Sequence, residues 1–319
     1  MWYRRSIALL FALVPLCSVG SAGAQAYPTK LMRIVTAATG SANDWGSRVL
    51  AQELTGSMGQ QVIVENRGGL SMEYVAKAPP DGHTLLMGTI AVLAINPSLY
   101  KDLAIDPVRD FAPVSRAADS TNILVVHPAL PVKNVGDLIA LARSRPGDLV
   151  YGSSGVGTAG HLSGELFSSM ARVKLVHVPY KGGPPSMIDL IAGRLQLVFA
   201  TAVVAVPQMQ AGKVKALAVT IAKRSAFAPV LPTMAEAGLP GFEANNWYGL
   251  VAPVKTPAEI VARLNREVVL ALGSPEVREA LFKQGIEAAP GTPEEFGAYM
   301  KSEIAKWRRV VQVSGATPN

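Results

Sequence analysis

Cysteine and clustered charge are both scarce in this chain. Its 319 residues include a single cysteine, Cys17, and only 17% of them are charged. Cys17 lies in an N-terminal segment that we expect to be removed, so the mature chain would have no disulfide, no thiol nucleophile and no cysteine metal ligand. Lysine and arginine form no cluster larger than adjacent pairs, which argues against a nucleic-acid-binding surface. The net charge of +7 is dispersed, which favours small anions.

Apolar runs of membrane-spanning length are also lacking. The N-terminal run, Ile7 to Leu16, has ten residues, about half of the ~20 that a bilayer helix needs. Arg4 and Arg5 precede it, and small residues with Ala-x-Ala sites follow it up to Ala26. This order is typical of a secretory signal, so we expect residues 1–26 to be cleaved and the mature protein to be exported.

The order of predicted elements in the rest of the chain is typical of an α/β protein. Short β-branched runs alternate with helical patterns from Leu31 to Val219, which is typical of parallel α/β sheets. The last seventy residues or so are mostly helical, with helix starts predicted at Thr256, Ser274 and Thr292. This pattern predicts an α/β fold of two lobes joined by a hinge, because the chain would visit the second lobe and return. We expect residues 27–124 and 248–319 to form domain 1 and residues 125–247 to form domain 2.

A Gly-x-Gly-x-x-Gly pattern runs from Gly155 to Gly160, between a predicted strand and a predicted helix. Read literally, it indicates a dinucleotide site, which needs an acidic residue at the end of the next strand. The residues there are 178–181 (VPYK), and from that point no acidic residue appears before Asp189. The same backbone N–H groups at a helix start bind anions in general. Ser153, Ser154 and Thr158 would add hydroxyl donors there.

An esterase is the other enzymatic alternative, with Ser154 as nucleophile and His161 as base. The nucleophile elbow needs Gly-x-Ser-x-Gly, and neither Ser153 nor Ser154 has glycine on both sides at that spacing. The four histidines lack the spacing of a zinc site, so we expect no metal and no cofactor. We expect a binding protein rather than an enzyme; an oxidoreductase or esterase stays open.

Four polar, glycine-containing segments follow predicted strands. They are 39–44, 66–71, 153–158 and 180–185. Loops at the carboxyl ends of parallel strands are where open α/β sheets bind ligands. If the two lobes oppose each other, all four segments face one cleft.

The order of several short motifs resembles that of the tripartite tricarboxylate transporter substrate-binding proteins, the Bug family, over about Tyr27 to Gly315. The matching stretches are 27–30 (YPTK), 64–67 (VENR), 80–88 (PDGHTLLMG), 96–100 (NPSLY), 110–114 (DFAPV), 151–155 (YGSSG), 161–165 (HLSGE), 177–182 (HVPYKG), 232–238 (PTMAEAG) and 247–249 (WYG).

This resemblance implies a periplasmic solute-binding protein whose lobes close on a small organic carboxylate. It implies a membrane permease or a sensor as partner, and we expect a monomer. The residues implied for the ligand are Ala38, Thr39, Gly40 and Ser41 in the first lobe and Ser153, Ser154, Gly157, Thr158, Tyr180, Lys181 and Gly182 in the second. His161 would support the second-lobe loop.

Two departures from the family pattern fall on the ligand side of the first lobe. The first loop has Thr39-Gly40-Ser41 where the family commonly has Pro-Gly-Gly. After Asn66-Arg67 the family usually continues with Pro-Gly-Ala-Gly-Gly, whereas this chain reaches Val75 several residues sooner. Leu70 and Met72 bring apolar side chains to the segment that remains. We therefore expect a preference for a larger and less polar acid than citrate.

Overall fold

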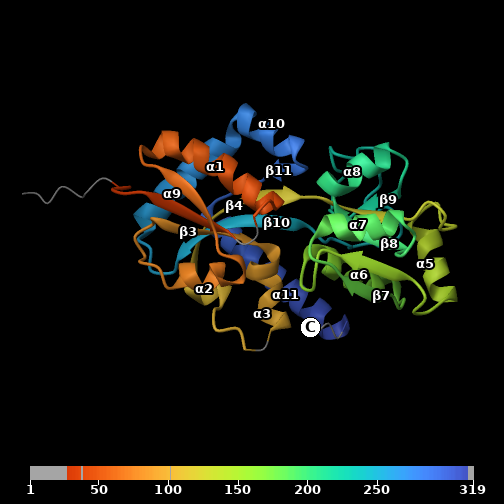
Figure 1. The fold of residues 1–319 in the computed structure, drawn as a ribbon. Coiled ribbons are helices and arrows are strands. Elements are labelled where there is room, and N and C mark those ends of the chain that lie inside the picture. The colour runs from red at the N-terminus through yellow and green to blue at the C-terminus, as the bar shows by residue number, and fades with distance from the viewer. Residues whose placement is uncertain (1–26, 37–38, 101, 315–319) are drawn as a thin grey trace, which may run out of the picture.

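The computed structural model describes residues 27–36, 39–100 and 102–314. The expected signal segment, Cys17 and Ala38 therefore lie outside the described residues. Two sheets form two lobes that lie side by side (Figure 1). The chain passes from the first lobe to the second after β4 (Phe111–Ser120) and returns before β10 (Asn246–Pro253).

The first lobe is built on a six-stranded sheet in the order β11-β4-β10-β3-β1-β2. Helices α1, α9 and α10 pack on one face of this sheet, and α2, α3 and α11 pack on the other (Figure 1). Its elements before the first crossing are β1 (Met32–Thr36), α1 (Ala42–Met58), β2 (Val62–Asn66), the 3-10 turn η1 (Gly68–Leu70), α2 (Ser71–Ala76), β3 (Thr84–Thr89), the π-helical turn η2 (Ala91–Ile95), α3 (Asn96–Leu99), α4 (Pro107–Asp110) and β4 (Phe111–Ser120).

The second lobe is built on a five-stranded sheet in the order β7-β6-β8-β5-β9. Its elements are β5 (Asn122–Val126), α5 (Val135–Ser144), β6 (Val150–Ser153), α6 (Ala159–Ala171), β7 (Val176–Pro179), α7 (Gly183–Ile191), β8 (Leu197–Thr201), α8 (Ala202–Gln210) and β9 (Lys215–Val219). The chain then returns to the first lobe through β10 (Asn246–Pro253), α9 (Ala258–Gly273), α10 (Pro275–Lys283), β11 (Ile286–Ala288) and α11 (Pro293–Ser314).

The two-lobed α/β fold is confirmed, but the sheets are mixed rather than parallel. Strands β1, β2 and β3 pair in parallel, as do β6, β7 and β8. The pairs that involve β10, β11, β5 and β9 are antiparallel. Strand β10 returns from the second lobe and enters between β3 and β4 without a helical crossover, so it runs opposite to both.

The chain crosses between the lobes twice, at Thr121 and just before Asn246. The Thr220 N–H donates to the Asn122 carbonyl at 3.0 Å, and the Thr220 hydroxyl donates to the Ala244 carbonyl at 2.9 Å, so the outgoing and returning segments are held together. All of β5 belongs to the second sheet. The division of the chain into domains at residues 124 and 247 stays a prediction.

Two of the three predicted helix starts have the expected cap. The Thr292 hydroxyl accepts from the Glu295 N–H at 3.1 Å, and the Glu295 carboxylate accepts from the Thr292 N–H at 2.8 Å. Ser274 likewise accepts from the Val277 N–H. The hydroxyl cap predicted at Thr256 is wrong, because α9 begins one residue later and Thr256 instead donates to the Pro253 carbonyl at 2.8 Å.

The long helix α11 ties the core of the first lobe to the second. It packs against β4 and η2, and also against α6 of the second lobe. The buried indoles of Trp247 and Trp307 both donate to Glu303 Oε2 at 3.0 Å, and Lys306 forms an ion pair with the same carboxylate. Its packing against α6 makes this helix a third connection between the lobes, beside the two strand crossings.

Candidate functional site

The carboxyl ends of six parallel strands carry the loops that can bind a ligand. In the first lobe these loops follow β1, β2 and β3, and in the second they follow β6, β7 and β8. Open α/β sheets bind ligands at this edge because the strands end there and the following helices begin.

The two loop edges face each other across the molecule. A Cβ built on Gly157, in the loop after β6, would lie 3.1 Å from Leu99 Cδ2 of α3. On the other face of the first sheet, a Cβ built on Gly285 would lie 2.9 Å from the Val203 nitrogen at the start of α8. The lobes therefore touch on two flanks, with the strand-end loops between them.

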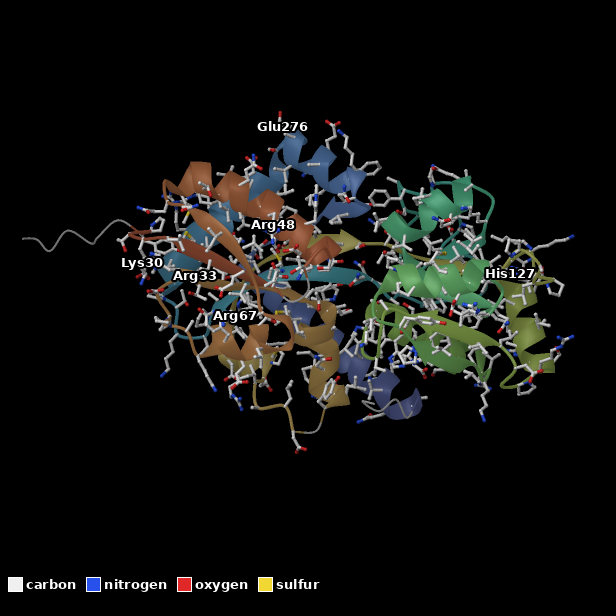
Figure 2. The ribbon with its side chains drawn as sticks, in the orientation of Figure 1. Lys30, Arg33, Arg48, Arg67, His127 and Glu276 are labelled. Carbon is white, nitrogen blue, oxygen red and sulfur yellow. The ribbon has the colours of Figure 1, made fainter. Side chains whose placement is uncertain are left out.

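The first-lobe loop is organised around a buried carboxylate at the start of α1. Asp44 accepts from the Gly40 N–H at 2.9 Å, from Asn66 Nδ2 at 2.9 Å and from Arg48 at 3.0 Å. Burial alone would raise the pKa of Asp44, but these hydrogen bonds outweigh it and hold the pKa below its usual value. Ser41 caps the helix by accepting from the Asp44 N–H at 3.1 Å. The loop backbone is thus fixed by its own side chains, and Arg48 lies at its rim (Figure 2).

In the second-lobe loop, two of the predicted hydroxyl donors are already engaged. The Ser153 hydroxyl lies 3.0 Å from the Gly155 carbonyl and 2.7 Å from His177 Nε2, and it accepts from the Gly155 N–H. The Thr158 hydroxyl donates to the same Gly155 carbonyl at 2.7 Å while it caps α6. Both side chains therefore shape the loop, and neither has a hydrogen left for a ligand in this arrangement.

His161 and His177 form a stack behind this loop. Their ring centroids are 4.1 Å apart, and the Gly157 N–H donates to His161 Nδ1 at 3.1 Å. Burial lowers the pKa of His161 to about 4, and burial together with the neighbouring His161 lowers that of His177 to about 3. Both rings are therefore neutral at pH 7, and His161 holds the backbone at Gly157.

The loop after β7 lies against the loop after β6. The Tyr180 N–H donates to the Ser153 carbonyl at 3.0 Å, and the Gly182 N–H donates to the Ser154 carbonyl at 3.2 Å. Gly182 has a φ of 108°, which favours glycine. The Tyr180 hydroxyl points away to Asp189 at 2.7 Å, and its pKa is raised to about 12, first by burial and then by that carboxylate.

Two polar side chains of the second-lobe loops remain available. Ser154 and Lys181 are exposed, and no residue in the described part of the chain hydrogen-bonds their side chains. Thr39 and Gly40 of the first-lobe loop are exposed as well. The assignment of these residues to a ligand stays a prediction. Among the predicted residues, those whose polar groups have no partner in the described part of the protein are the candidates that remain.

Sequence reasoning missed three residues at this edge. Thr89 ends β3, Thr201 ends β8, and Arg48 lies one helical turn after Asp44. The positions of Thr89 and Thr201 at this edge depend on the direction in which their strands run, and a single sequence does not give that direction. For Arg48 the sequence did carry a signal, because an acidic and a basic residue at the spacing of Asp44 and Arg48 form an ion pair on a helix.

The enzymatic alternatives find little support in this geometry. His161 Nδ1 accepts from the Gly157 N–H, and Nε2 lies 3.7 Å from a carboxylate oxygen of Glu165, so both ring nitrogens have partners other than Ser154. Ser153 does pair with His177, but it is only 1% exposed. Gly160, the last glycine of the Gly-x-Gly-x-x-Gly pattern, allows close packing, since a Cβ there would lie 2.8 Å from the Phe199 carbonyl oxygen.

Two further features are absent from the described residues. Within 27–36, 39–100 and 102–314, no group of three or more His, Cys, Asp or Glu side chains could hold a metal ion. No helix in these same ranges has the length and apolar character needed to cross a membrane.

Comparison with known proteins identifies the family. Residues 47–316 match the model of the tripartite tricarboxylate transporter family receptor. Protein BugT of Bordetella pertussis is 34% identical over 299 residues, which cover 92% of each chain.

Solved structures agree with this match. The R. palustris protein Rpa4515 with adipate is 40% identical, with a TM-score of 0.81 over 92% of this chain and 100% of that one. MatC from Rhodopseudomonas palustris with bound malate is 31% identical, with a TM-score of 0.77 over 89% of this chain and 100% of that one. The resemblance drawn from the sequence motifs is confirmed: the chain belongs to the tripartite tricarboxylate transporter receptor family of solute-binding proteins.

Proposed function

We propose that the protein is a periplasmic receptor that binds a small organic carboxylate between the facing loops of its lobes and delivers it unchanged to a membrane permease or a sensor. Support comes from the family and from the solved structures of Rpa4515 with adipate and of MatC with bound malate. The cleaved signal at residues 1–26 and a monomeric state belong to the same proposal.

The observation that carries the proposal is the pair of unpartnered donors at the second-lobe loops. The exposed Lys181 ammonium and Ser154 hydroxyl lie on two loops joined by the Gly182 N–H to Ser154 carbonyl bond. Behind them begins the 13-residue helix α6, whose N-terminal dipole favours an anion. A carboxylate bound here would add hydrogen bonds without breaking those that hold the loops.

The experiment is a thermal-shift screen of adipate, malate, citrate and benzoate, followed by calorimetry on the best binder. A ligand at 100 times its Kd stabilises the folded state by about 2.7 kcal/mol. We expect Lys181→Gln and Ser154→Ala to weaken binding, the former by about 1.5–3 kcal/mol because it removes a charged donor. Lys213→Gln, which changes an exposed lysine after α8, is the matched control.

Thr158→Val provides a separate check of the geometry. Its hydroxyl is bound to Gly155, so we expect a loss of stability from the lost cap that exceeds any direct loss of a ligand contact. If none of the acids binds, or if Lys181→Gln and Lys213→Gln bind the ligand equally well, the proposed site is wrong.

A further inference from the structure

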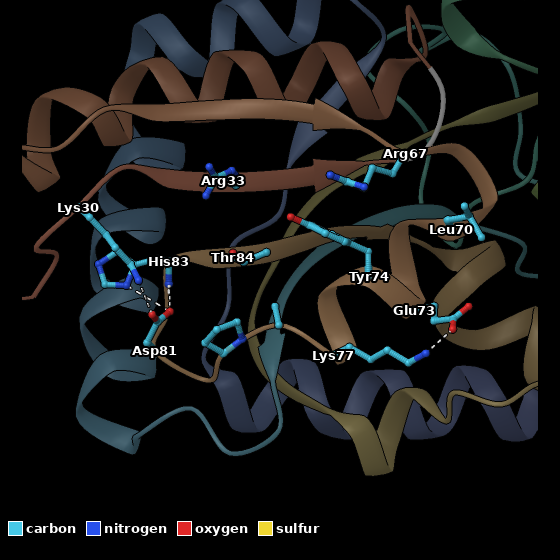
Figure 3. A pocket seen from close by; sticks show the side chains of 12 residues that line it. Lys30, Arg33, Arg67, Leu70, Glu73, Tyr74, Lys77, Asp81, His83 and Thr84 are labelled. Carbon is cyan, nitrogen blue, oxygen red and sulfur yellow. Dashed lines mark hydrogen bonds and ion pairs between the residues drawn. The ribbon is translucent and has the colours of Figure 1, made fainter.

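A groove of about 610 Å³ lies on the first lobe, away from the second-lobe loops that carry Ser154 and Lys181. It crosses the sheet face between β1, β3 and α2 (Figure 3). Arg67 and Leu70 stand at one end and Lys30 and His83 at the other.

The groove exists because this part of the sheet is poorly covered. Strand β2 is the edge of the first sheet, and among the described residues the helix that covers this end of the face is α2, which has six residues. The segment between β2 and α2 is the short stretch Arg67 to Leu70. The side chains of Arg33 and Thr84 on the strands are therefore left facing the groove (Figure 3).

The charges of the groove do not cancel. Lys30 pairs with Asp81 at 2.9 Å, and Lys77 pairs with Glu73. The two arginines share a single carboxylate: Glu65 forms an ion pair with Arg67 and lies 3.8 Å from the Arg33 Nε. Three carboxylates thus face four cations, and Arg33, with its long contact and a side chain 42% exposed, is the one least neutralised.

The other part of the groove is apolar and flat. The Arg67 guanidinium carbon lies 3.6 Å from the centroid of the Tyr74 ring, so the two planar groups stack. Figure 3 shows Tyr74 extending from α2 across β3 toward Thr84, with Arg67 pointing back along the strands toward it. Leu70 is 68% exposed, whereas Met72 is buried in the core, so of the two apolar residues in the shortened segment only Leu70 is presented to a ligand.

We propose that this groove binds an aryl carboxylate, with the carboxylate at Arg33 and the ring against Tyr74. The carboxylate supplies the charge that the four cations lack, and the ring covers apolar surface. A purely aliphatic short-chain acid satisfies the first requirement only. This site is independent of the one at Ser154 and Lys181.

The test is an NMR titration of the full mature chain with benzoate, cyclohexanecarboxylate and acetate as probes. We expect benzoate to shift the backbone amides of Arg33, Tyr74 and Thr84, with affinity falling at least about threefold for cyclohexanecarboxylate and further for acetate. Arg33→Gln and Tyr74→Leu should each weaken benzoate binding by at least about threefold. Arg224→Gln, which removes an exposed, ion-paired arginine of the second lobe, is the control.

The outcomes of the titration distinguish this groove site from the proposed interlobe site. Shifts confined to the amides of Ser154, Lys181 and their neighbours would overturn the groove site while supporting the interlobe one. Equal affinity for benzoate and acetate would remove the aromatic subsite. Benzoate binding unchanged in both Arg33→Gln and Tyr74→Leu, with unfolding midpoints showing that both variants are folded, would refute the proposal.

Discussion

The ring of Phe227 stacks on the ring of Phe282, with centroids 4.4 Å apart and an angle of 24° between the planes. Phe227 belongs to the segment after β9 in the second lobe, whereas Phe282 lies on α10 of the first. The contact is on the α10 side of the first sheet, and the Gly157 to Leu99 contact is on the α3 side (Figure 1). The aromatic pair therefore joins the lobes at a point outside both strand crossings.

We expect this pair to favour the closed arrangement of the lobes. An aromatic pair contributes about 0.5–1.5 kcal/mol beyond its buried area, which is enough to change the populations of two arrangements severalfold. Phe282→Ala should therefore increase the radius of gyration of the ligand-free protein in small-angle X-ray scattering. It should also weaken ligand binding by a similar free energy, because the open form would have to close first.

Tyr100→Ala is the matched control, since Tyr100 is an exposed aromatic residue of the first lobe. A double-mutant cycle with Phe227→Ala measures the pair itself. An unchanged radius of gyration in Phe282→Ala, with no coupling between the two substitutions, would show that the stack does not hold the lobes together.

The second prediction concerns Glu303, which accepts from two buried indoles. Glu303→Leu leaves both indole N–H groups without an acceptor, and an unsatisfied buried donor costs about 1–3 kcal/mol. We expect the free energy of unfolding in urea to fall by about 2–5 kcal/mol, and by less in Glu303→Gln, which keeps one carbonyl oxygen. Glu279→Leu, at an exposed ion pair on α10, should cost much less than Glu303→Leu, because solvent screens an exposed pair. A Glu303→Leu protein as stable as Glu279→Leu would contradict this role.

The third prediction is a pH dependence that arises from the histidine stack. The pKa of His161 is about 4 and that of His177 about 3 in the folded protein, against about 6.5 when unfolded. At a pH between the folded and unfolded pKa values, the unfolded chain binds more protons than the folded one. The contribution of these histidines to the free energy of unfolding is therefore complete above about pH 6.5 and falls as the pH drops toward 4. The groups that face the stack are Tyr151, Ser153 and Glu165.

Urea unfolding between pH 7.5 and pH 4.5 measures this slope. His177→Phe keeps a ring against His161 but removes one titrating group, so we expect a flatter profile. His127→Gln is the control, because His127 lies at the far side of the second lobe (Figure 2). Parallel profiles for all three proteins would assign the acid sensitivity to other groups.

Much of the fold follows from local patterns in the sequence. Helix α5 begins at Val135, where the Asn134 side chain caps it, and ends at Ser144. Gly59 and Gly285 have positive φ values just after helices, where glycine avoids a steric cost. These features depend on residues within a few positions of each other, so the sequence alone predicts them. The motif order was also sufficient to identify the family.

Contacts between residues far apart in the sequence decide which polar groups of the candidate site are engaged and which are free. His177 reaches Ser153 from 24 positions away, and Trp247 reaches Glu303 from 56. The sequence showed three hydroxyls near the start of α6, but only the fold shows that Ser153 and Thr158 bond to Gly155 while Ser154 stays open. It also places β10 between β3 and β4, which makes the sheet mixed. Such pairings depend on which buried surfaces and polar groups satisfy each other across the chain, and local spacing does not encode that.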